Sequence, residues 1–89
     1  MKKIEKLKIT YFGLSHLGLV HSISTALKNF KITSFDFDKK KIQEFKKGNF
    51  NIDEPNIYKF YKKIKSNIKF TNDINDLVDS DIIYFSLDI

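Results

Sequence analysis

The first apolar segment of the chain is short and ends at a glycine. Residues 7–12 are rich in β-branched and aromatic side chains and are followed by Gly13, which is typical of a β-strand. From there the period changes to the spacing of three and four that marks a helix with one buried face. The residues on that expected face are Leu17, Val20, Ile23, Ser24 and Leu27. We expect this helix to end near Asn29.

The next two elements repeat the alternation of strand and helix. Residues 30–35 are again short and apolar, and they predict a second strand. Residues 39–47 predict a short helix with Asp38 as its N-cap and Gly48 just past its end.

The second half of the chain continues the pattern. Pro55 suits the first turn of a third helix. The residues expected on its buried face are Ile57, Phe60, Tyr61 and Ile64. Residues 68–70 predict a brief strand, and the capping residues 71–73 precede a further turn of helix. Residues 82–87 predict a last strand that is apolar on both faces.

The element order is therefore β-α-β-α-α-β-α-β. Alternation at this spacing predicts an α/β fold, a Rossmann-like three-layer arrangement around a parallel sheet of about four strands. Strands that are apolar on both faces lie inside parallel sheets. We therefore expect the last strand to leave an open edge, as in the first half of a dinucleotide-binding domain.

Composition removes several classes of function. The chain has 89 residues with no cysteine and two histidines, so thiolate chemistry and a zinc site built from these residues are not expected. The net charge of +5 comes from lysine alone, without the arginine that a nucleic-acid binder is expected to use. The aromatic and lysine residues between 58 and 65 are better explained by a solvated amphipathic helix than by a nucleic-acid surface. No apolar run reaches the length of a membrane helix, and we expect a cytoplasmic protein without nucleic-acid or membrane partners.

Chemistry concentrates between the first strand and the first helix. Gly13, Ser15 and Gly18 form G-x-S-x-x-G, one residue away from the dinucleotide-binding fingerprint. In that fingerprint the helix N-terminus holds the pyrophosphate. Ser15 stands where the backbone must approach the ligand, and its hydroxyl is able to donate to a phosphate.

An acidic residue follows the second strand at the expected distance. Asp36 lies 18 residues after Gly18, where the fingerprint places a carboxylate that binds the adenosine ribose. Such a carboxylate favours NAD over NADP, although Lys39, Lys40 and Lys41 keep NADP open. The alternative is that Asp36, like Asp38, only serves a turn.

The chain resembles the UDP-glucose/GDP-mannose dehydrogenases. The likeness lies in ordered segments, which are residues 9–20, 34–42, 51–57, 70–73 and 80–83. The resemblance implies an NAD-binding domain in which Gly13, Leu17 and Gly18 border the pyrophosphate, Asp36 holds the adenosine ribose and Lys41 lies beside the adenosine half. In the predicted fold His16 lies at the rim of the cofactor site, and we expect it to contact the cofactor through its backbone.

Three positions depart from the family. The family has glycine where Ser15 stands, usually an aromatic residue where His16 stands, and a cofactor-contacting threonine where Ile89 stands.

The resemblance also bounds the function. It implies the NAD-binding N-terminal portion of an enzyme that oxidises a sugar C6 alcohol to a carboxylate. We expect residues 1–89 to form a partial Rossmann domain without the substrate and catalytic domains, and without turnover of its own. The expected partners are NAD and either the remainder of a split dehydrogenase or a second copy paired through the open edge. Two alternatives are a non-catalytic pairing module and a fragment of a hydroxy-acid or hydroxyacyl dehydrogenase.

Overall fold

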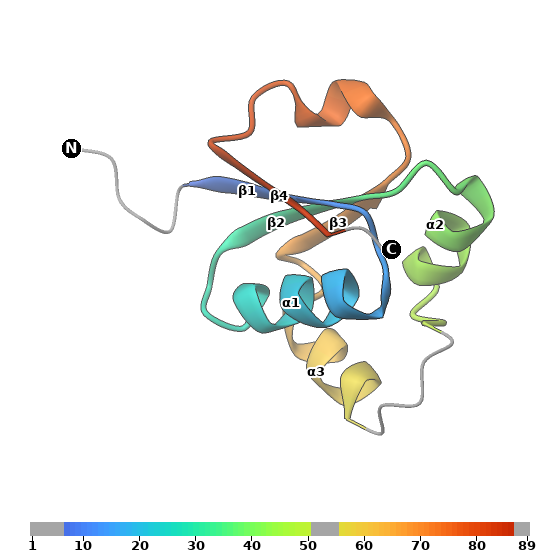
Figure 1. Cartoon of the computed structure of the whole chain (residues 1–89). Helices are drawn as coiled ribbons and strands as arrows, with labels where there is room; N and C mark the ends of the chain where they lie inside the picture. The colour runs from blue at the N-terminus through green and yellow to red at the C-terminus, as the bar shows by residue number, and fades with distance from the viewer. Residues whose placement is uncertain (1–6, 51–55, 87–89) are drawn as a thin grey trace.

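The computed structural model describes residues 7–50 and 56–86 (Figure 1). The predicted helix start at Pro55, most of the acidic segment 51–57, and Ile89 lie outside the described residues. The strands are β1 (Lys8–Phe12), β2 (Lys31–Phe35), β3 (Ile68–Thr71) and β4 (Ile82–Phe85). The helices are α1 (His16–Ala26), α2 (Lys39–Lys46) and α3 (Ile57–Ile64), and a 3-10 helix, η2 (Ile74–Leu77), lies between β3 and β4.

The four strands form one parallel sheet in the order β3-β2-β1-β4. Phe12 at the end of β1 pairs in register with Phe35 of β2 and with Phe85 of β4. The residues that follow these three strands are Gly13, Asp36 and Ser86. They therefore lie side by side at the carboxyl-terminal end of the strands. The predicted α/β architecture with a four-stranded parallel sheet is confirmed.

One face of the sheet carries the main core. Helices α1 and α3 lie under this face, as Figure 1 shows, while η2 lies over the other. The buried side chains of this core come from β1, β2, β3 and the helices, and they include Ile9, Tyr11, Leu19, Ile23, Ile32, Ile42, Phe45, Ile64 and Phe70. Phe45 of α2 packs edge to face on Phe70 of β3, with ring centres 5.6 Å apart.

The buried face of α1 differs from the predicted one. Leu17 is 58% exposed and Leu27 is 40% exposed, whereas Leu19 is fully buried. The face that meets the sheet carries Gly18, Leu19, Ser22, Ile23 and Ala26. Three of these residues are small and recur every four positions, which lets the helix approach the sheet closely. The period predicted from the large apolar residues was right, but the rotation of the helix was wrong.

Helix α3 also departs from its predicted face in one position. Ile57 and Ile64 are buried, and Tyr61 packs on Phe50 with ring centres 5.0 Å apart. Phe60, which the spacing placed inward, is 37% exposed. The buried stripe of this two-turn helix is narrower than the predicted one.

The second face of the sheet is only partly covered within the described residues. Phe12, Phe35 and Phe85 form a row across β2, β1 and β4, with ring centres 4.8 and 5.1 Å apart. Phe37 stands edge-on against Phe12 and Phe35. Phe37 and Phe85 are about 70% exposed. The aromatic row therefore reaches the surface at the carboxyl-terminal end of the strands, where the loops that follow the strands also lie.

Candidate functional site

The loop between β1 and α1 needs glycine at two positions. Gly13 has φ 103°, in the left-handed region that glycine adopts without strain, and its N–H donates to the Phe35 carbonyl at 2.8 Å. A Cβ on Gly18 would collide with the Gly13 carbonyl oxygen and lie 3.0 Å from the Ser86 hydroxyl. The local backbone geometry therefore explains why glycine is needed at both of these positions of the motif.

Ser15, the middle residue of the motif, is the N-cap of α1. Its hydroxyl accepts a hydrogen bond from the Gly18 N–H at 3.2 Å, and its side chain is buried. The Ser86 hydroxyl lies 3.3 Å away, so the cap joins the end of β4 to the start of α1.

The first two amides of α1 point out of the helix end. The first backbone bond of α1 runs from Leu19 N–H to the Ser15 carbonyl, so His16 and Leu17 have no acceptor within the helix for their N–H groups. Both side chains are exposed. The backbone N–H groups of these two predicted site residues are therefore available to an anion at the helix N-terminus.

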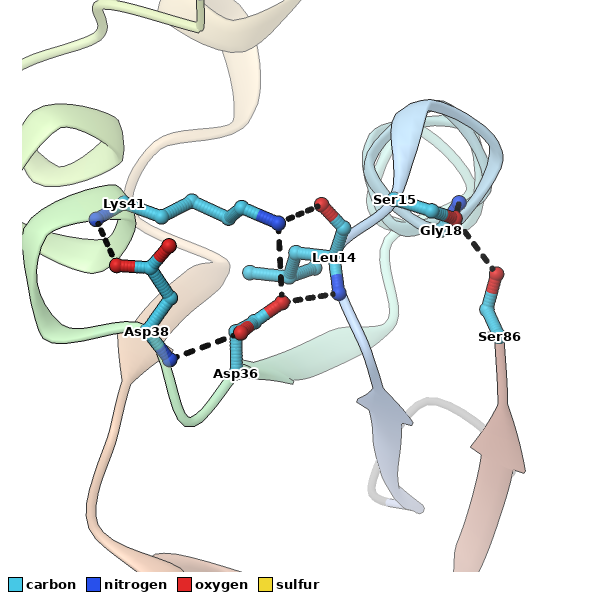
Figure 2. Close-up of polar contacts among 7 residues, drawn as sticks. All are labelled: Leu14, Ser15, Gly18, Asp36, Asp38, Lys41 and Ser86. Carbon is cyan, nitrogen blue, oxygen red and sulfur yellow. Dashed lines mark hydrogen bonds and ion pairs between the residues drawn. The ribbon is translucent and has the colours of Figure 1, made fainter. Parts of the chain in front are cut away.

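Asp36 fastens the end of β2 to the glycine loop. Its Oδ2 accepts from the Leu14 N–H at 2.9 Å, and its Oδ1 accepts from the Asp38 N–H at 2.9 Å (Figure 2). The Lys41 ammonium lies 3.3 Å from Oδ2 and also donates to the Leu14 carbonyl at 3.2 Å. Asp38 caps α2 by accepting from the Lys41 N–H, as predicted.

These contacts set the charge of Asp36. Burial raises the pKa of its carboxyl, but the hydrogen bonds from the Asp38 and Leu14 N–H groups, together with the Lys41 charge, outweigh burial and hold the pKa below its usual 3.8. Asp36 is therefore an anion at neutral pH. A carboxylate has about four acceptor positions, and Oδ1, which takes one donor here, has room for another.

A pocket of about 470 Å³ lies between the glycine loop and α2. Its lining comes from residues 14–16, from the side of α2 that faces the loop, and from Asn49 and Phe50. Ser15, His16 and Lys41 are thus brought to one place. Asp36 is hydrogen-bonded to two of the residues that line the pocket, Leu14 and Lys41.

Ser86 lies beside the candidate site, and it was not predicted from the sequence. It directly follows β4, and its N–H extends the sheet ladder by donating to the Phe12 carbonyl at 2.8 Å. In open α/β sheets ligands bind at the carboxyl ends of the strands, and applying that rule to every strand would have found it.

Residues 7–88 match the model of the UDP-glucose/GDP-mannose dehydrogenase family, NAD binding domain. The chain belongs to this family. The family match favours the nucleotide-sugar dehydrogenases over the hydroxy-acid and hydroxyacyl enzymes that the glycine motif left open.

Solved structures of nucleotide-sugar dehydrogenases share the fold. A UDP-D-ManNAc dehydrogenase from Pyrococcus horikoshii superposes with a TM-score of 0.86 at 25% identity, over 91% of this chain and 20% of that one. A UDP-glucose dehydrogenase from Pyrobaculum islandicum gives a TM-score of 0.84 at 16% identity, over 98% of this chain and 21% of that one. The chain therefore spans about one fifth of the length of these dehydrogenases.

One curated relative is also detected. An uncharacterized protein of Methanocaldococcus jannaschii is 25% identical over 79 residues, which cover 88% of this chain and 9% of that protein.

In residues 7–50 and 56–86, no helix has the length and apolar character needed to cross a membrane. The same residues hold no group of three or more His, Asp or Glu side chains arranged for a metal ion.

Proposed function

We propose that this chain binds NAD as the N-terminal NAD-binding portion of a nucleotide-sugar 6-dehydrogenase. The observation that carries the proposal is the bond between the Asp36 carboxylate and the Leu14 N–H. It fixes a ribose acceptor beside the loop that leads into the N-terminus of α1. Family membership supports the same cofactor class.

The proposed binding mode uses the backbone of α1 and the side chain of Asp36. The N–H groups of His16 and Leu17 donate to the pyrophosphate, helped by the positive end of the helix dipole. Asp36 would accept a hydrogen bond from a hydroxyl of the adenosine ribose through Oδ1. The 2′-phosphate of NADP would lie against this anion, so NAD is the preferred cofactor.

Lys41 completes the site from α2. Its ammonium bridges the Leu14 carbonyl and the Asp36 carboxylate, which holds the glycine loop at a fixed distance from the end of β2. NAD supplies hydride acceptance when bound, and these residues of the chain bind and orient it.

We further propose that the 89-residue chain has no turnover of its own. The oxidation implied by the family resemblance ends in a carboxylate and uses a cysteine nucleophile, and this chain has no cysteine. A polypeptide with the remainder of a dehydrogenase is the partner that would supply it. Formation of NADH from UDP-glucose by the chain alone would contradict this proposal.

Calorimetric titration of the purified chain with NAD and NADP tests cofactor binding. We expect NAD to bind and Asp36→Ala to weaken it by about tenfold or more, the value of one hydrogen bond to a charged group. Asp79→Asn is a matched control, because Asp79 pairs with Lys8, at the start of β1, the opposite end of that strand from Gly13. An absence of heat with millimolar NAD would overturn the proposal.

A second candidate, a non-catalytic pairing module, is favoured by the edge of β4. All four residues of this strand are exposed and apolar or aromatic, and Phe85 is 69% exposed. An uncharged edge strand pairs readily with another chain. Light scattering after size exclusion should then show concentration-dependent dimers that Tyr84→Lys disperses. Tyr58→Lys is the control, because Tyr58 and Tyr84 are both 50% exposed but Tyr58 lies on α3. A chain that stays monomeric at all concentrations would contradict pairing.

A further inference from the structure

Two hydroxyl groups face each other where β4 meets the start of α1. Ser15 Oγ and Ser86 Oγ are 3.3 Å apart, and either one is able to donate the proton between them (Figure 2). Ser15 Oγ also accepts from the Gly18 N–H. Both backbones are fixed, since Ser15 is the N-cap of α1 and the Ser86 N–H bonds to the Phe12 carbonyl.

The position of one proton decides what Ser15 offers to a ligand. A serine hydroxyl has one donor and two acceptor positions, and the Gly18 N–H occupies one acceptor. If Ser15 donates to Ser86, only a lone pair remains, which repels a phosphate oxygen. If Ser86 donates to Ser15, the Ser15 proton is free to reach a third partner.

We propose that Ser15 is a pyrophosphate donor in this chain and that Ser86 is the positioning residue that orients its proton. The inference rests on the proposed NAD binding and deepens it. The anion favours the arrangement in which Ser86 donates to Ser15 and Ser15 donates to the phosphate oxygen. Ser15 thereby supplies a hydroxyl donor at the position where the fingerprint has glycine for a close backbone approach.

This role predicts an effect confined to ligands that carry phosphate. Removal of the Ser86 hydroxyl leaves the cap of Gly18 intact, because Ser15 still accepts from that amide. Adenosine binding, which depends on Asp36, is then unchanged. A purely structural role of the serine pair would instead alter the affinity for both ligands equally.

The experiment compares ADP-ribose and adenosine in NMR titrations of the wild-type chain and its variants. We expect Ser86→Ala to weaken ADP-ribose by about threefold, as for one neutral hydrogen bond, with adenosine unchanged. Ser15→Ala should weaken ADP-ribose by about tenfold, and Ser15→Thr, which keeps a hydroxyl, should restore it. Ser24→Ala, at an exposed position of α1, is the control.

Three outcomes separate the possibilities. Tighter ADP-ribose binding by Ser15→Gly would overturn the inference, because the serine would then only crowd the ligand. Equal losses for ADP-ribose and adenosine would also overturn it, since they indicate a structural role alone. If the folded wild-type chain binds neither ligand, the proposed cofactor site fails, and the inference that rests on it fails with it.

Discussion

At the scale of single residues, Asp36 connects three parts of the chain. Its carboxylate holds the Leu14 amide of the glycine loop, the Asp38 amide and the Lys41 ammonium. Each contact favours the charged form, and their sum outweighs the burial that opposes it. The proposed ligand contact and the local fold therefore depend on the same charge.

This coupling predicts a dependence of stability on pH. Because the folded pKa of Asp36 lies below its ordinary 3.8, the stabilisation is fully present above about pH 4 and is lost as the pH falls through the folded pKa. Asp36→Asn should lower the free energy of unfolding at pH 7, and this difference from the wild type should disappear at low pH. Urea denaturation at a series of pH values measures it.

Asp79→Asn controls for the other carboxylates. The hydrogen bond from Lys8 lowers the pKa of the Asp79 carboxyl as well, but that group is exposed and should contribute little. A difference between wild type and Asp36→Asn that stays constant from pH 2.5 to 7 would contradict the linkage.

At the scale of elements, helix α1 shows what periodicity predicts and what it does not. The spacing of apolar residues predicted a helix, and α1 is there. Its rotation is set by the loop from β1, because Gly18 must lie against the Gly13 carbonyl. The buried face consequently runs through Gly18, Ser22 and Ala26, residues whose side chains carry little hydrophobic signal.

A pair of leucines in α1 tests this rotation. Leu19→Ala should lower the free energy of unfolding by about 2–5 kcal/mol, because it leaves a cavity at a fully buried position. Leu17→Ala should change it by about 0.5 kcal/mol, as is usual at exposed positions. Chemical denaturation of both variants provides the measurement, and a larger loss for Leu17→Ala than for Leu19→Ala would show that the predicted face is the buried one.

In the candidate site, too, the residues that belong to local motifs are predicted from the sequence, whereas a residue distant along the chain is not. Gly13, Ser15, Gly18 and Asp36 follow from local motifs at the ends of the first two strands, so the sequence predicts them. Ser86 lies 71 residues after Ser15, and its place beside the glycine loop exists only because β4 pairs with β1. The rule that ligands bind at the carboxyl ends of parallel strands points to Ser86, but its contact with Ser15 depends on this pairing, which no local motif of the sequence predicts.

At the scale of the whole molecule, the two edges of the sheet differ. Edge strand β3 has three of its four side chains buried, including Ile68 and Phe70, whereas β4 has none buried. Packing from the helices stabilises β3 within the main core. The stability of β4 depends mainly on its hydrogen bonds to β1 and on the aromatic row.

Hydrogen exchange should resolve this difference. Among amides bonded within the sheet, those of β4 should exchange by local opening and sooner than those of β3. Exchange followed by NMR on the wild-type chain gives both strands in one sample. Equal protection of the two edges would indicate that the sheet opens only by global unfolding.

The stacked pair of Tyr11 and Tyr84 gives the chain an optical reporter of its own. Their rings are 5.3 Å apart and 20° from parallel, and they join β1 to β4. The chain has four tyrosines and no tryptophan, so its tyrosine circular dichroism and tyrosine emission come from four residues. Whatever detaches or covers β4 changes the coupling of these two rings. The state of the open edge can therefore be followed spectroscopically without a label.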